Sequence, residues 1–388
     1  MEHQPIITQS FQVKYEYKLY FTEGLFSKDN PLLAQVIAVI PDTEKVKTLF
    51  VVDGGVYLKH PNLLDAIENY CQANNKIDSR GILVVPGGEE AKNNPQVVEK
   101  ILKGINEKSI CRHSFVVVIG GGSVIDAAGY AATIAHRGVK LIRIPTSVLA
   151  QNDAAVGVKN GVNAFGKKNF VGTFSLPEAI INDSNFLETL EQRDWIAGIA
   201  EAIKVALLKD VAFFDFIQTN AKKLAQRDRE SMRHLIYRCA EIHMQHIAQG
   251  GDPFEKGSSR PLDFGHWAAH KLEQMTNYEL RHGEAVAMGI ALDVTYANLI
   301  GLIDDNLLAQ VLETFHEIGF DLQVPIKKDE SVERLMSGIE EFREHLGGQL
   351  TITLISGIGK KHDVHEIDHD KMKKAICIRA IQKSTLTC

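Results

Sequence analysis

The feature that most constrains the fold is a regular alternation, beginning near Thr48, of short apolar runs rich in β-branched residues with longer amphipathic stretches. The amphipathic stretches have the spacing of helices and lie near residues 62–72, 91–105 and 124–135. The short runs predict strands at residues 48–52, 81–85, 114–119 and 140–144. Strands that alternate with helices in this way lie parallel, and right-handed crossovers place the helices on both faces of the sheet. The sequence therefore predicts an α/β domain.

After about Asp183 the pattern changes, because β-branched runs disappear and long helix-like stretches follow at residues 194–208, 213–225 and 230–248. Only residues 349–354 near the C-terminus still predict a strand. At 388 residues, of which 45% are hydrophobic and 24% charged, the chain is long and apolar enough for two domains with separate cores. We predict an α/β domain over residues 1–183 and a mostly α-helical domain over residues 184–388.

The chain carries a net charge of −6, so no overall positive field attracts nucleic acid or an anionic membrane surface. An anionic ligand must therefore be bound by local cations. No apolar run approaches the roughly 18 to 20 residues that cross a bilayer, and residues 1–15 lack the charged and apolar blocks of a signal peptide. We expect a cytoplasmic protein whose partners include neither nucleic acid nor a membrane.

A glycine-rich turn, Gly120-Gly121-Gly122-Ser123, lies between a predicted strand and a predicted helix that contains Asp126. Glycines let the backbone approach a diphosphate, which the free N–H groups and the positive end of the helix then bind. A tight turn without a ligand is the alternative, but three glycines between a strand and a helix favour nucleotide binding.

Two further loops follow predicted strands and are candidates for the same ligand. The segment from Pro86 to Lys92, which includes Glu89, opens a helix with polar side chains. Asp53 follows the first predicted strand, where a carboxylate can accept hydrogen bonds from a ribose hydroxyl. A loop that only opens a helix, and an aspartate that only belongs to a turn, would show the same residues without binding a ligand.

Asp153, Lys159, Lys168 and Asn169 lie in or next to a glycine-rich segment, residues 156–172, that resembles neither helix nor strand. Several polar groups in such a segment are typical of a binding loop. A flexible charged loop fits the same residues equally well.

The most specific pattern is a set of histidines and a glutamate in the second half of the chain. His266 and His270 are spaced i, i+4, so one helix face presents both imidazoles, and His282 and Glu201 lie downstream and upstream. Two histidines and one carboxylate are the ligands of a catalytic zinc with an open position for substrate. With 15 histidines a chance pair is common, and we interpret a second pair, which includes His243, as ordinary packing or surface residues.

Together these motifs resemble the 3-dehydroquinate synthase family of sugar phosphate cyclases over about residues 45–370. The resemblance implies a Rossmann-like NAD-binding domain followed by a helical metal-binding domain. The matching blocks are Gly88-Glu89-Glu90-Ala91-Lys92, the glycine run through Asp126, Ala135-His136-Arg137-Gly138, residues 145–153, Lys168-Asn169, Glu201-x-x-Lys204, Gly265-His266-x-x-x-His270 and His282-Gly283-Glu284.

The resemblance also implies the roles of individual residues. A zinc ion, or cobalt in its place, would be held by Glu201, His266 and His282. NAD would be lined by Asp53, Glu89, Lys92, Gly121, Gly122, Ser123, Asp126, Thr146, Ser147, Phe186 and Thr189, with Lys168 between cofactor and substrate. The substrate would contact Asp153, Lys159, Asn169, Lys204, Asp263 and His270. Arg137 matches an arginine that reaches the substrate phosphate in the neighbouring subunit, which implies a homodimer.

In this family NAD+ transiently oxidises a substrate hydroxyl, phosphate leaves by β-elimination, the hydride returns, and the opened ring closes by an intramolecular aldol reaction. The resemblance therefore implies a lyase that regenerates its NAD. In such a site His270 would donate a hydrogen bond or relay a proton, unless it only packs beneath the metal.

The chain departs from true 3-dehydroquinate synthases where they bind the substrate carboxylate. Counting back from the first zinc histidine, Ser259 replaces the family arginine, Asp263 an asparagine and Gln245 a lysine, while Arg260 is one residue out of register. Fewer cations and an added aspartate disfavour a further anionic group on the substrate. We expect a heptulose phosphate without a carboxylate, similar to the sedoheptulose 7-phosphate that 2-epi-5-epi-valiolone synthases use.

Three alternatives remain. Authentic 3-dehydroquinate synthase, acting on 3-deoxy-arabino-heptulosonate 7-phosphate, is the first. The glycine run also resembles that of metal-dependent NAD alcohol and glycerol dehydrogenases, which need no phosphate-binding set such as Lys159, Lys168, Asn169 and Lys204. A non-catalytic scaffold is disfavoured because all three metal ligands of the family are present.

Overall fold

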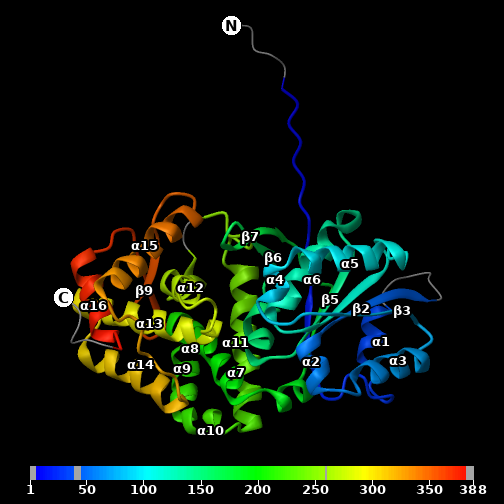
Figure 1. Ribbon diagram of the computed structural model, residues 1–388, viewed down its shortest axis with the longest axis horizontal. Helices are drawn as coiled ribbons and strands as arrows, with labels where there is room; N and C mark the ends of the chain where they lie inside the picture. The colour runs from blue at the N-terminus through cyan, green and yellow to red at the C-terminus, as the bar shows by residue number, and fades with distance from the viewer. Residues whose placement is uncertain (1–5, 39–44, 258–259, 382–388) are drawn as a thin grey trace.

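Among the described residues, six parallel strands form the large sheet, in the order β1-β8-β5-β4-β2-β3, and occupy one half of the molecule (Figure 1). The computed structural model describes residues 6–38, 45–257 and 260–381. The strands are β1 (Lys18–Thr22), β2 (Val46–Asp53), β3 (Ile77–Val85), β4 (Phe115–Gly120), β5 (Lys140–Pro145) and β8 (Ala179–Asp183). The helices of this half are α1 (Leu32–Ile37), α2 (Gly54–Lys59), α3 (Leu63–Ala73), α4 (Glu90–Asn93), α5 (Pro95–Glu107), α6 (Gly122–Ile134) and η1 (Ala135–Arg137).

Side chains of the central strand β4 alternate between two separate cores. Phe115 and Val117 pack with α1 and α3, whereas Val116 and Val118 pack with α5 and α6. All four are fully buried, as expected for a parallel strand that helices cover on both faces. The predicted α/β architecture of the first half is therefore confirmed.

The four strands predicted from the sequence are confirmed as β2, β3, β4 and β5, whereas β1 and β8 are absent from the prediction. The single helix predicted at residues 91–105 is wrong, because two helices, α4 and α5, meet at Pro95. Proline lacks an N–H and begins α5, where that N–H has no helical partner in any case. The Asn94 side chain caps the new helix by accepting from the Gln96 N–H at 3.1 Å.

An antiparallel hairpin of β6 (Lys159–Ala164) and β7 (Lys167–Phe174) occupies most of residues 156–172, so the expectation that this segment is neither helix nor strand is wrong. A π-helical turn, η2 (Ala150–Ala154), precedes it. The hairpin lies over α6 and exposes alternate residues of β7, so its strands lack the apolar runs by which the sheet was predicted. It carries Lys168 to Glu273 of the helical half, while the neighbouring Asn169 contacts Lys92 of the sheet half.

A fully buried guanidinium ties this hairpin to the sheet. Arg143 of β5 donates from Nη1 to the carbonyls of Ala155 and Gly157, at 2.8 and 2.6 Å, and from Nη2 to Asn160 Oδ1 at 2.8 Å. Three acceptors compensate for the cost of burying this charge. The segment between η2 and β6, which joins Asp153 to Lys159, is thereby fixed against the sheet.

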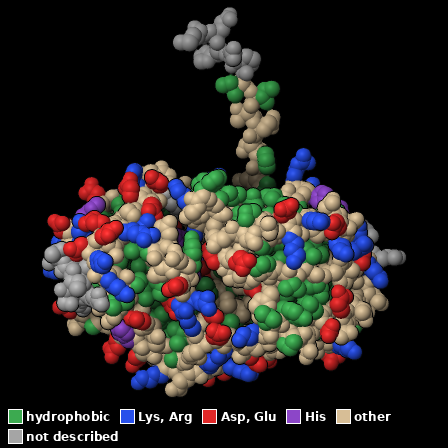
Figure 2. All heavy atoms as spheres, viewed as in Figure 1, with side chains coloured by type: hydrophobic (Ala, Val, Ile, Leu, Met, Phe, Trp, Pro, Cys, Tyr) green, Lys and Arg blue, Asp and Glu red, His purple; other side chains and the backbone are tan. Residues whose placement is uncertain are grey.

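The chain before β1 lies outside every helix and strand and projects from the body as an extended arm, residues 6–17 (Figure 1). Apolar side chains gather where the arm leaves the surface (Figure 2).

The second half of the chain is mostly helical, as predicted. None of its helices, nor any other described helix, is both long and apolar enough to cross a membrane. Its elements are η3 (Ser184–Thr189), α7 (Gln192–Ala197), α8 (Ile199–Lys209), α9 (Val211–Thr219), α10 (Ala221–Ala225), α11 (Arg229–Gln249), η4 (Pro261–Asp263), α12 (His266–Met275), α13 (His282–Leu299), α14 (Asp305–Ile318), α15 (Asp329–His345), β9 (Ile352–Gly357), β10 (Lys360–Val364) and α16 (His369–Arg379). The strand expected at residues 349–354 is β9, and its antiparallel partner β10 is absent from the prediction.

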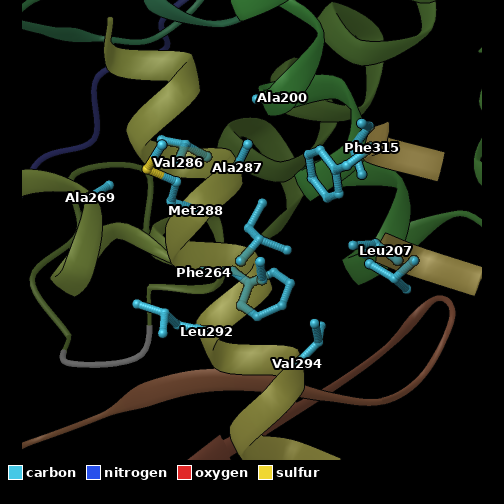
Figure 3. Packing of buried hydrophobic residues seen from close by; sticks show 14 of the residues in the cluster. Ala200, Leu207, Phe264, Ala269, Val286, Ala287, Met288, Leu292, Val294 and Phe315 are labelled. Atoms are coloured by element: carbon cyan, nitrogen blue, oxygen red, sulfur yellow. The ribbon is translucent and has the colours of Figure 1, made fainter. Parts of the chain in front are cut away.

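The core of this half forms around α13, which is buried along almost its whole length. Figure 3 shows side chains of α8, α12 and α14 gathered about Val286, Ala287, Met288 and Leu292 of this helix. Small residues on α13 let neighbouring helices approach closely, so the N-terminal end of α13 lies directly against α7 and α8.

A buried carboxylate on α13 fixes the start of α12. Asp293 accepts from the Gly265 N–H at 3.0 Å and from the Trp267 indole N–H at 2.8 Å, the residues on either side of His266. Burial raises the pKa of Asp293 to about 7, although both hydrogen bonds lower it. The carboxyl group therefore holds a proton in the native state across most of the acidic range.

We predict that the Asp293→Asn variant gains stability relative to the wild type as the pH rises. The native state retains the Asp293 proton to about pH 7, while the unfolded chain releases it near pH 4, so the wild type loses roughly 1.4 kcal/mol per pH unit between these values. Between pH 5 and 7 the difference in unfolding free energy should shift toward the variant by about 2 to 3 kcal/mol. Denaturant unfolding at each pH measures this, with exposed Asp370→Asn as the matched control. A pH-independent difference would contradict the assignment.

Candidate active site

The carboxyl ends of β2, β4 and β5 lie at one edge of the sheet and face the helical half, so the loops that follow them form one wall of a site. Asp53, Gly120 and Pro145 are the last residues of these strands. In open parallel sheets this edge is where ligands bind.

The glycine turn leaves a helix end open to a ligand. A Cβ at Gly121 would meet nothing within 4 Å, so the backbone here is accessible, and the 13-residue helix α6 begins at the next residue. Asp53 Oδ2 lies 3.5 Å from the Gly121 N, and Oδ1 caps α2 by accepting from the Gly55 N–H at 2.8 Å. Asp53 is therefore a capping residue that also stands beside the turn.

Four of the residues predicted to line a nucleotide form ion pairs and hydrogen bonds with one another. Ser123 donates to Glu89 Oε2 at 3.2 Å, and Lys92 Nζ lies 2.7 Å from Asp126 Oδ2. Lys92 also contacts the Asn169 side chain on β7. The glycine turn, the start of α4 and the hairpin are thus joined by polar contacts.

The other predicted cofactor residues lie along the same edge. The Thr146 N–H donates to the Gly120 carbonyl at 3.1 Å, and Ser147 Oγ accepts from the Ala150 N–H at 3.2 Å. Thr189 Oγ1 lies 2.8 Å from His60 Nε2, and the Phe186 ring packs edge-on against the same imidazole. His60 and Phe186 line a pocket of about 430 Å³.

Glu201, His266 and His282 place their ligand atoms within 4.8 Å of one another. Glu201 Oε1 lies 3.6 Å from His266 Nε2 and 3.4 Å from His282 Nε2, although it is fully buried and makes no hydrogen bond with any described residue. A Cβ on Gly283 would overlap the Ala197 carbonyl, so only glycine lets the start of α13 bring His282 this close to α8. Three metal-ligand atoms that converge without forming hydrogen bonds to one another fit a cation.

The second nitrogen of each imidazole already has an acceptor. His266 Nδ1 lies 3.1 Å from the Phe264 carbonyl, and His282 Nδ1 lies 3.4 Å from Glu273 Oε2. A neutral imidazole that donates through Nδ1 offers a lone pair at Nε2, which here faces Glu201. This is the arrangement expected of histidine ligands to zinc or cobalt.

Glu273 is the site residue that the sequence analysis missed. Its carboxylate is buried, lies beside His282 and forms an ion pair with Lys168 Nζ at 2.7 Å. Burial lowers the pKa of His282, but the carboxylates of Glu273 and Glu201 raise it to about 9, so a metal ion that binds Nε2 displaces a proton from it. The signal was present, because Glu273 follows His266 by seven residues and His270 by three on one helix face.

Lys204 and Asp153 stand next to the three candidate ligands. Lys204 is buried and pairs with Glu201; burial would lower the pKa of Lys204, but Glu201 and Asp153 raise it above its usual value. Burial and the charge of Glu201 would raise the pKa of Asp153, but Lys204 and His243 hold it below its usual range. Lys204 and Asp153 therefore both stay charged at neutral pH.

His243 lies 3.1 Å from Asp153 Oδ1, through its Nδ1. The interpretation of His243 as an ordinary packing or surface residue therefore overlooked its contact with a candidate substrate residue. Only the packing of α11 against η2 brings the two together, since they are 90 residues apart in the chain.

His270 lies over the metal-ligand set as a neutral base. Its ring stacks on His282, with ring centroids 6.1 Å apart, and lies edge-on to His266. Burial and the neighbouring His266 lower the pKa of His270 well below its usual value. Such an imidazole can accept or relay a proton at neutral pH.

Asp263, one of the residues at which the chain departs from the family pattern, faces the same region. Burial would raise the pKa of Asp263, but Lys159, His266 and Lys204 hold it below its usual value. Lys159 pairs with Glu255 at 2.5 Å, and Arg260 lies 3.8 Å from the same carboxylate. Gln245 is exposed on α11, and Ser259 lies outside the described residues.

Arg137 is not brought to this site. It lies in η1, just before β5 begins, whereas the glycine turn follows the end of the neighbouring strand β4. Six residues of parallel strand separate the two positions, a distance of roughly 20 Å. The Arg137 side chain is exposed.

Comparison with known proteins gives a family match. The family models described as 3-dehydroquinate synthase N-terminal and C-terminal match residues 82–197 and 198–341. A 3-dehydroquinate synthase from Shewanella sp. (strain MR-4) is 30% identical over 375 residues, which are 96% of this chain and 99% of the relative.

Two solved structures share the fold over nearly the whole chain. ValA, a 2-epi-5-epi-valiolone synthase from Streptomyces hygroscopicus subsp. jinggangensis 5008 with NAD+ and Zn2+ bound, aligns with a TM-score of 0.86 and 25% identity, over 96% of this chain and 99% of that one. A 2-deoxy-scyllo-inosose synthase complexed with carbaglucose-6-phosphate, NAD+ and Co2+ aligns with a TM-score of 0.75 and 23% identity, over 92% and 95% of the two chains.

We predict that Glu273→Gln weakens zinc binding by about 10- to 100-fold, because the amide cannot anchor the His282 N–H as a carboxylate does. Competition with a chromogenic chelator measures the zinc dissociation constant directly. Glu279→Gln, the same change at an exposed position in the loop between α12 and α13, is the control and should leave the constant unchanged. Equal affinity in the two variants would show that Glu273 does not orient the ligand.

Proposed function

The chain belongs to the 3-dehydroquinate synthase family, and we propose that it is a sugar phosphate cyclase that uses NAD and a divalent metal ion to convert a heptulose phosphate into a carbocycle. The reaction eliminates phosphate, so the enzyme is a carbon–oxygen lyase. The observation that carries the proposal is the convergence of Glu201, His266 and His282 beside a buried Lys204, within reach of a hairpin that contacts the glycine turn.

The residues present fit both groups. Glu201, His266 and His282 would hold zinc, with cobalt as an alternative, and the ion when bound supplies a Lewis acid that stabilises negative charge on a substrate oxygen. NAD supplies a hydride acceptor that returns the hydride before the product leaves. The residues proposed to hold NAD are Asp53, Glu89, Lys92, Gly121, Gly122, Ser123, Asp126, Thr146, Ser147, Lys168, Phe186 and Thr189.

The chain's own charges prepare the phosphate to leave. Lys159, Lys204 and Asn169 carry donors on the substrate side, and neutralising a phosphate makes it a better leaving group. Lys168 is held between Glu89, at 3.8 Å, and Glu273, at 2.7 Å, where the cofactor and substrate regions meet.

Proton transfer falls to His270 and Asp153. The imidazole of His270 is neutral because burial and His266 lower its pKa, so in this role it donates a hydrogen bond to a substrate oxygen or relays a proton without retaining it. Asp153 is ionised and can accept hydrogen bonds from substrate hydroxyls while His243 orients it.

The substrate we propose lacks a carboxylate, as sedoheptulose 7-phosphate does. Asp263 and Glu255 add negative charge on the side where a carboxylate would need cations, and Arg260 is turned to Glu255. An ionised Asp263 can instead accept hydrogen bonds from sugar hydroxyls. The valiolone synthase from Streptomyces, named for a carbocycle of this kind, aligns over 96% of the chain.

Authentic 3-dehydroquinate synthase is the second candidate. The relatives found by sequence carry that name, and the one from Shewanella covers 96% of this chain at 30% identity. It would act on 3-deoxy-arabino-heptulosonate 7-phosphate, whose carboxylate would have to be bound without the usual arginine and lysine.

We further propose a homodimer in which Arg137 serves the neighbouring copy, since it lies at the far edge of the sheet from its own site. Residues 1–183 would bind NAD, and residues 184–388 the metal. The cytoplasm is the proposed location, because NAD and sugar phosphates are metabolites of that compartment.

We predict phosphate release from sedoheptulose 7-phosphate in the presence of NAD+ and zinc, without accumulation of reduced NAD. His282→Ala removes a proposed metal ligand and should abolish phosphate release together with bound zinc, while the circular dichroism spectrum is unchanged. Colorimetric phosphate detection and absorbance of reduced NAD follow the two products. Steady formation of reduced NAD from a simple alcohol, without phosphate release, would identify a dehydrogenase instead.

We predict that Asp263→Asn combined with Ser259→Arg shifts specificity toward 3-deoxy-arabino-heptulosonate 7-phosphate. Removing an anion and adding a cation stabilises a bound carboxylate. The ratio of kcat/KM for the carboxylated sugar phosphate to kcat/KM for sedoheptulose 7-phosphate should rise at least about 100-fold. Asp370→Asn, which removes the same charge on the surface, is the control. An unchanged ratio would contradict the electrostatic argument, and a wild-type preference for the carboxylated sugar would favour the second candidate.

A further inference from the structure

A strained tyrosine lies beside the lysine that joins the proposed cofactor and substrate regions. Tyr278 belongs to the loop between α12 and α13, residues 276–281, and its backbone is in the left-handed region, with a φ of 63°. Residues with a Cβ rarely adopt this conformation, because it brings the Cβ too close to a backbone carbonyl. Backbone strain of this kind persists only where the surrounding structure imposes it, and it is concentrated at functional sites.

The cap of α12 accounts for the neighbouring residue but not for Tyr278. The Tyr278 N–H donates to the Glu273 carbonyl at 2.7 Å and the Asn277 N–H to the Gln274 carbonyl at 3.3 Å, which are the two hydrogen bonds of a Schellman motif. The motif requires a left-handed residue at Asn277, where φ is 50° and asparagine is well tolerated. It requires none at the next position, so the cap leaves the conformation of Tyr278 unexplained.

The ring of Tyr278 meets the ammonium group of Lys168. The Lys168 Nζ lies over the ring, 5.5 Å from its centroid, where the quadrupole of an aromatic ring attracts a cation. The carboxylates of Glu273 and Glu89 approach the same Nζ, at 2.7 and 3.8 Å. The Lys168 side chain is only 15% exposed, so these three groups account for much of what surrounds it.

A ring beside an ammonium group differs from a third carboxylate in what it leaves free. An ammonium has three N–H donors, and a ring attracts the charge through its whole face rather than through one lone pair. Burial and the charges of Glu89 and Glu273 raise the pKa of Tyr278, so the phenol stays neutral and adds no further anion. Lys168 therefore keeps a donor for a ligand, while the ring keeps water away from the charge.

A residue of α7 fastens the loop that carries Tyr278. Arg193 donates from Nε and Nη2 to the two carboxylate oxygens of Glu284, each at 2.6 Å, and from Nη2 to the Glu279 carbonyl at 2.8 Å. The bond from the Tyr278 N–H to Glu273 fastens the loop to α12 on the other side. The loop is thus held on both sides of the strained residue, which keeps the ring at Lys168.

We propose that Tyr278 is a positioning residue for Lys168, whose ring holds the ammonium group between the glycine-turn region and the proposed metal region and leaves one N–H for an oxygen of the sugar phosphate. The identity of that ligand rests on the proposed function. The pairing of the ring with Lys168 is a property of the chain alone, so the two can fail separately.

Three variants separate the ring from the backbone strain. Tyr278→Gly removes the ring and relaxes the backbone, Tyr278→Phe keeps the ring, and Asn277→Gly adds a glycine to the same loop while keeping the ring. In the full-length protein as purified, the rate at which N-hydroxysuccinimide acetate acetylates Lys168 is measured by mass spectrometry, relative to the exposed Lys103 on α5. Tyr278→Gly should raise this rate at least about fivefold. Tyr278→Phe and Asn277→Gly should leave it as in the wild type.

Denaturant unfolding and phosphate release complete the test. Tyr278→Gly should unfold at the same or a higher denaturant concentration than the wild type, because relief of the strain offsets loss of the ring. Its kcat for phosphate release should fall about 10-fold, with an unchanged zinc dissociation constant, while Tyr278→Phe and Asn277→Gly keep the wild-type kcat.

Equal acetylation rates in Tyr278→Gly and the wild type would overturn the proposal. So would a Tyr278→Phe variant as impaired as Tyr278→Gly, because the ring alone would then not be sufficient. If the wild type releases no phosphate, the proposed function fails, and the acetylation rates still decide whether the ring holds Lys168.

Discussion

The buried carboxylate of Glu201 is the group on which the rest of the site depends. It has no accessible surface, and an isolated charge in that position costs several kcal/mol. Lys204 compensates for part of this cost from one turn away on α8, and His266 and His282 approach the other oxygen from two further helices. The close packing of α13 against α7, through Gly283, brings His282 to this carboxylate. A divalent ion satisfies all three donors at once.

One lysine on the hairpin joins the proposed metal region of the helical half to the glycine-turn region of the sheet half. Lys168 of β7 pairs with Glu273, which in turn contacts the second nitrogen of His282, while Glu89 of the sheet half lies on the other side of the lysine. The neighbouring Asn169 contacts Lys92 beside the glycine turn. Any displacement of β7 therefore changes the proposed metal and nucleotide regions together, and buried Arg143 restrains the segment that leads into the hairpin.

Sequence patterns succeeded where a local rule decides the structure. Continuous apolar runs identify β2, β4 and β5 because both faces of a central parallel strand are buried. They fail at the hairpin of β6 and β7, whose exposed face and lysines hide its period, and at Pro95, where one amphipathic stretch becomes two helices. Glu273 and Asp293 were not identified because a carboxylate on a helix face is ordinarily solvated, and only packing shows that these two are buried.

The sequence by itself determined the order of the motifs and the glycine turn at a strand end, because both follow from residue type and short-range spacing, and its resemblance to the family implied the three metal-ligand candidates. Only the tertiary structure decided that Glu201, His266 and His282 meet, that His243 touches Asp153, and that Arg137 lies far from its own site. The physical reason is the same in each case. Contacts between residues tens of positions apart depend on how helices pack and strands pair, and no local pattern in the chain records that packing.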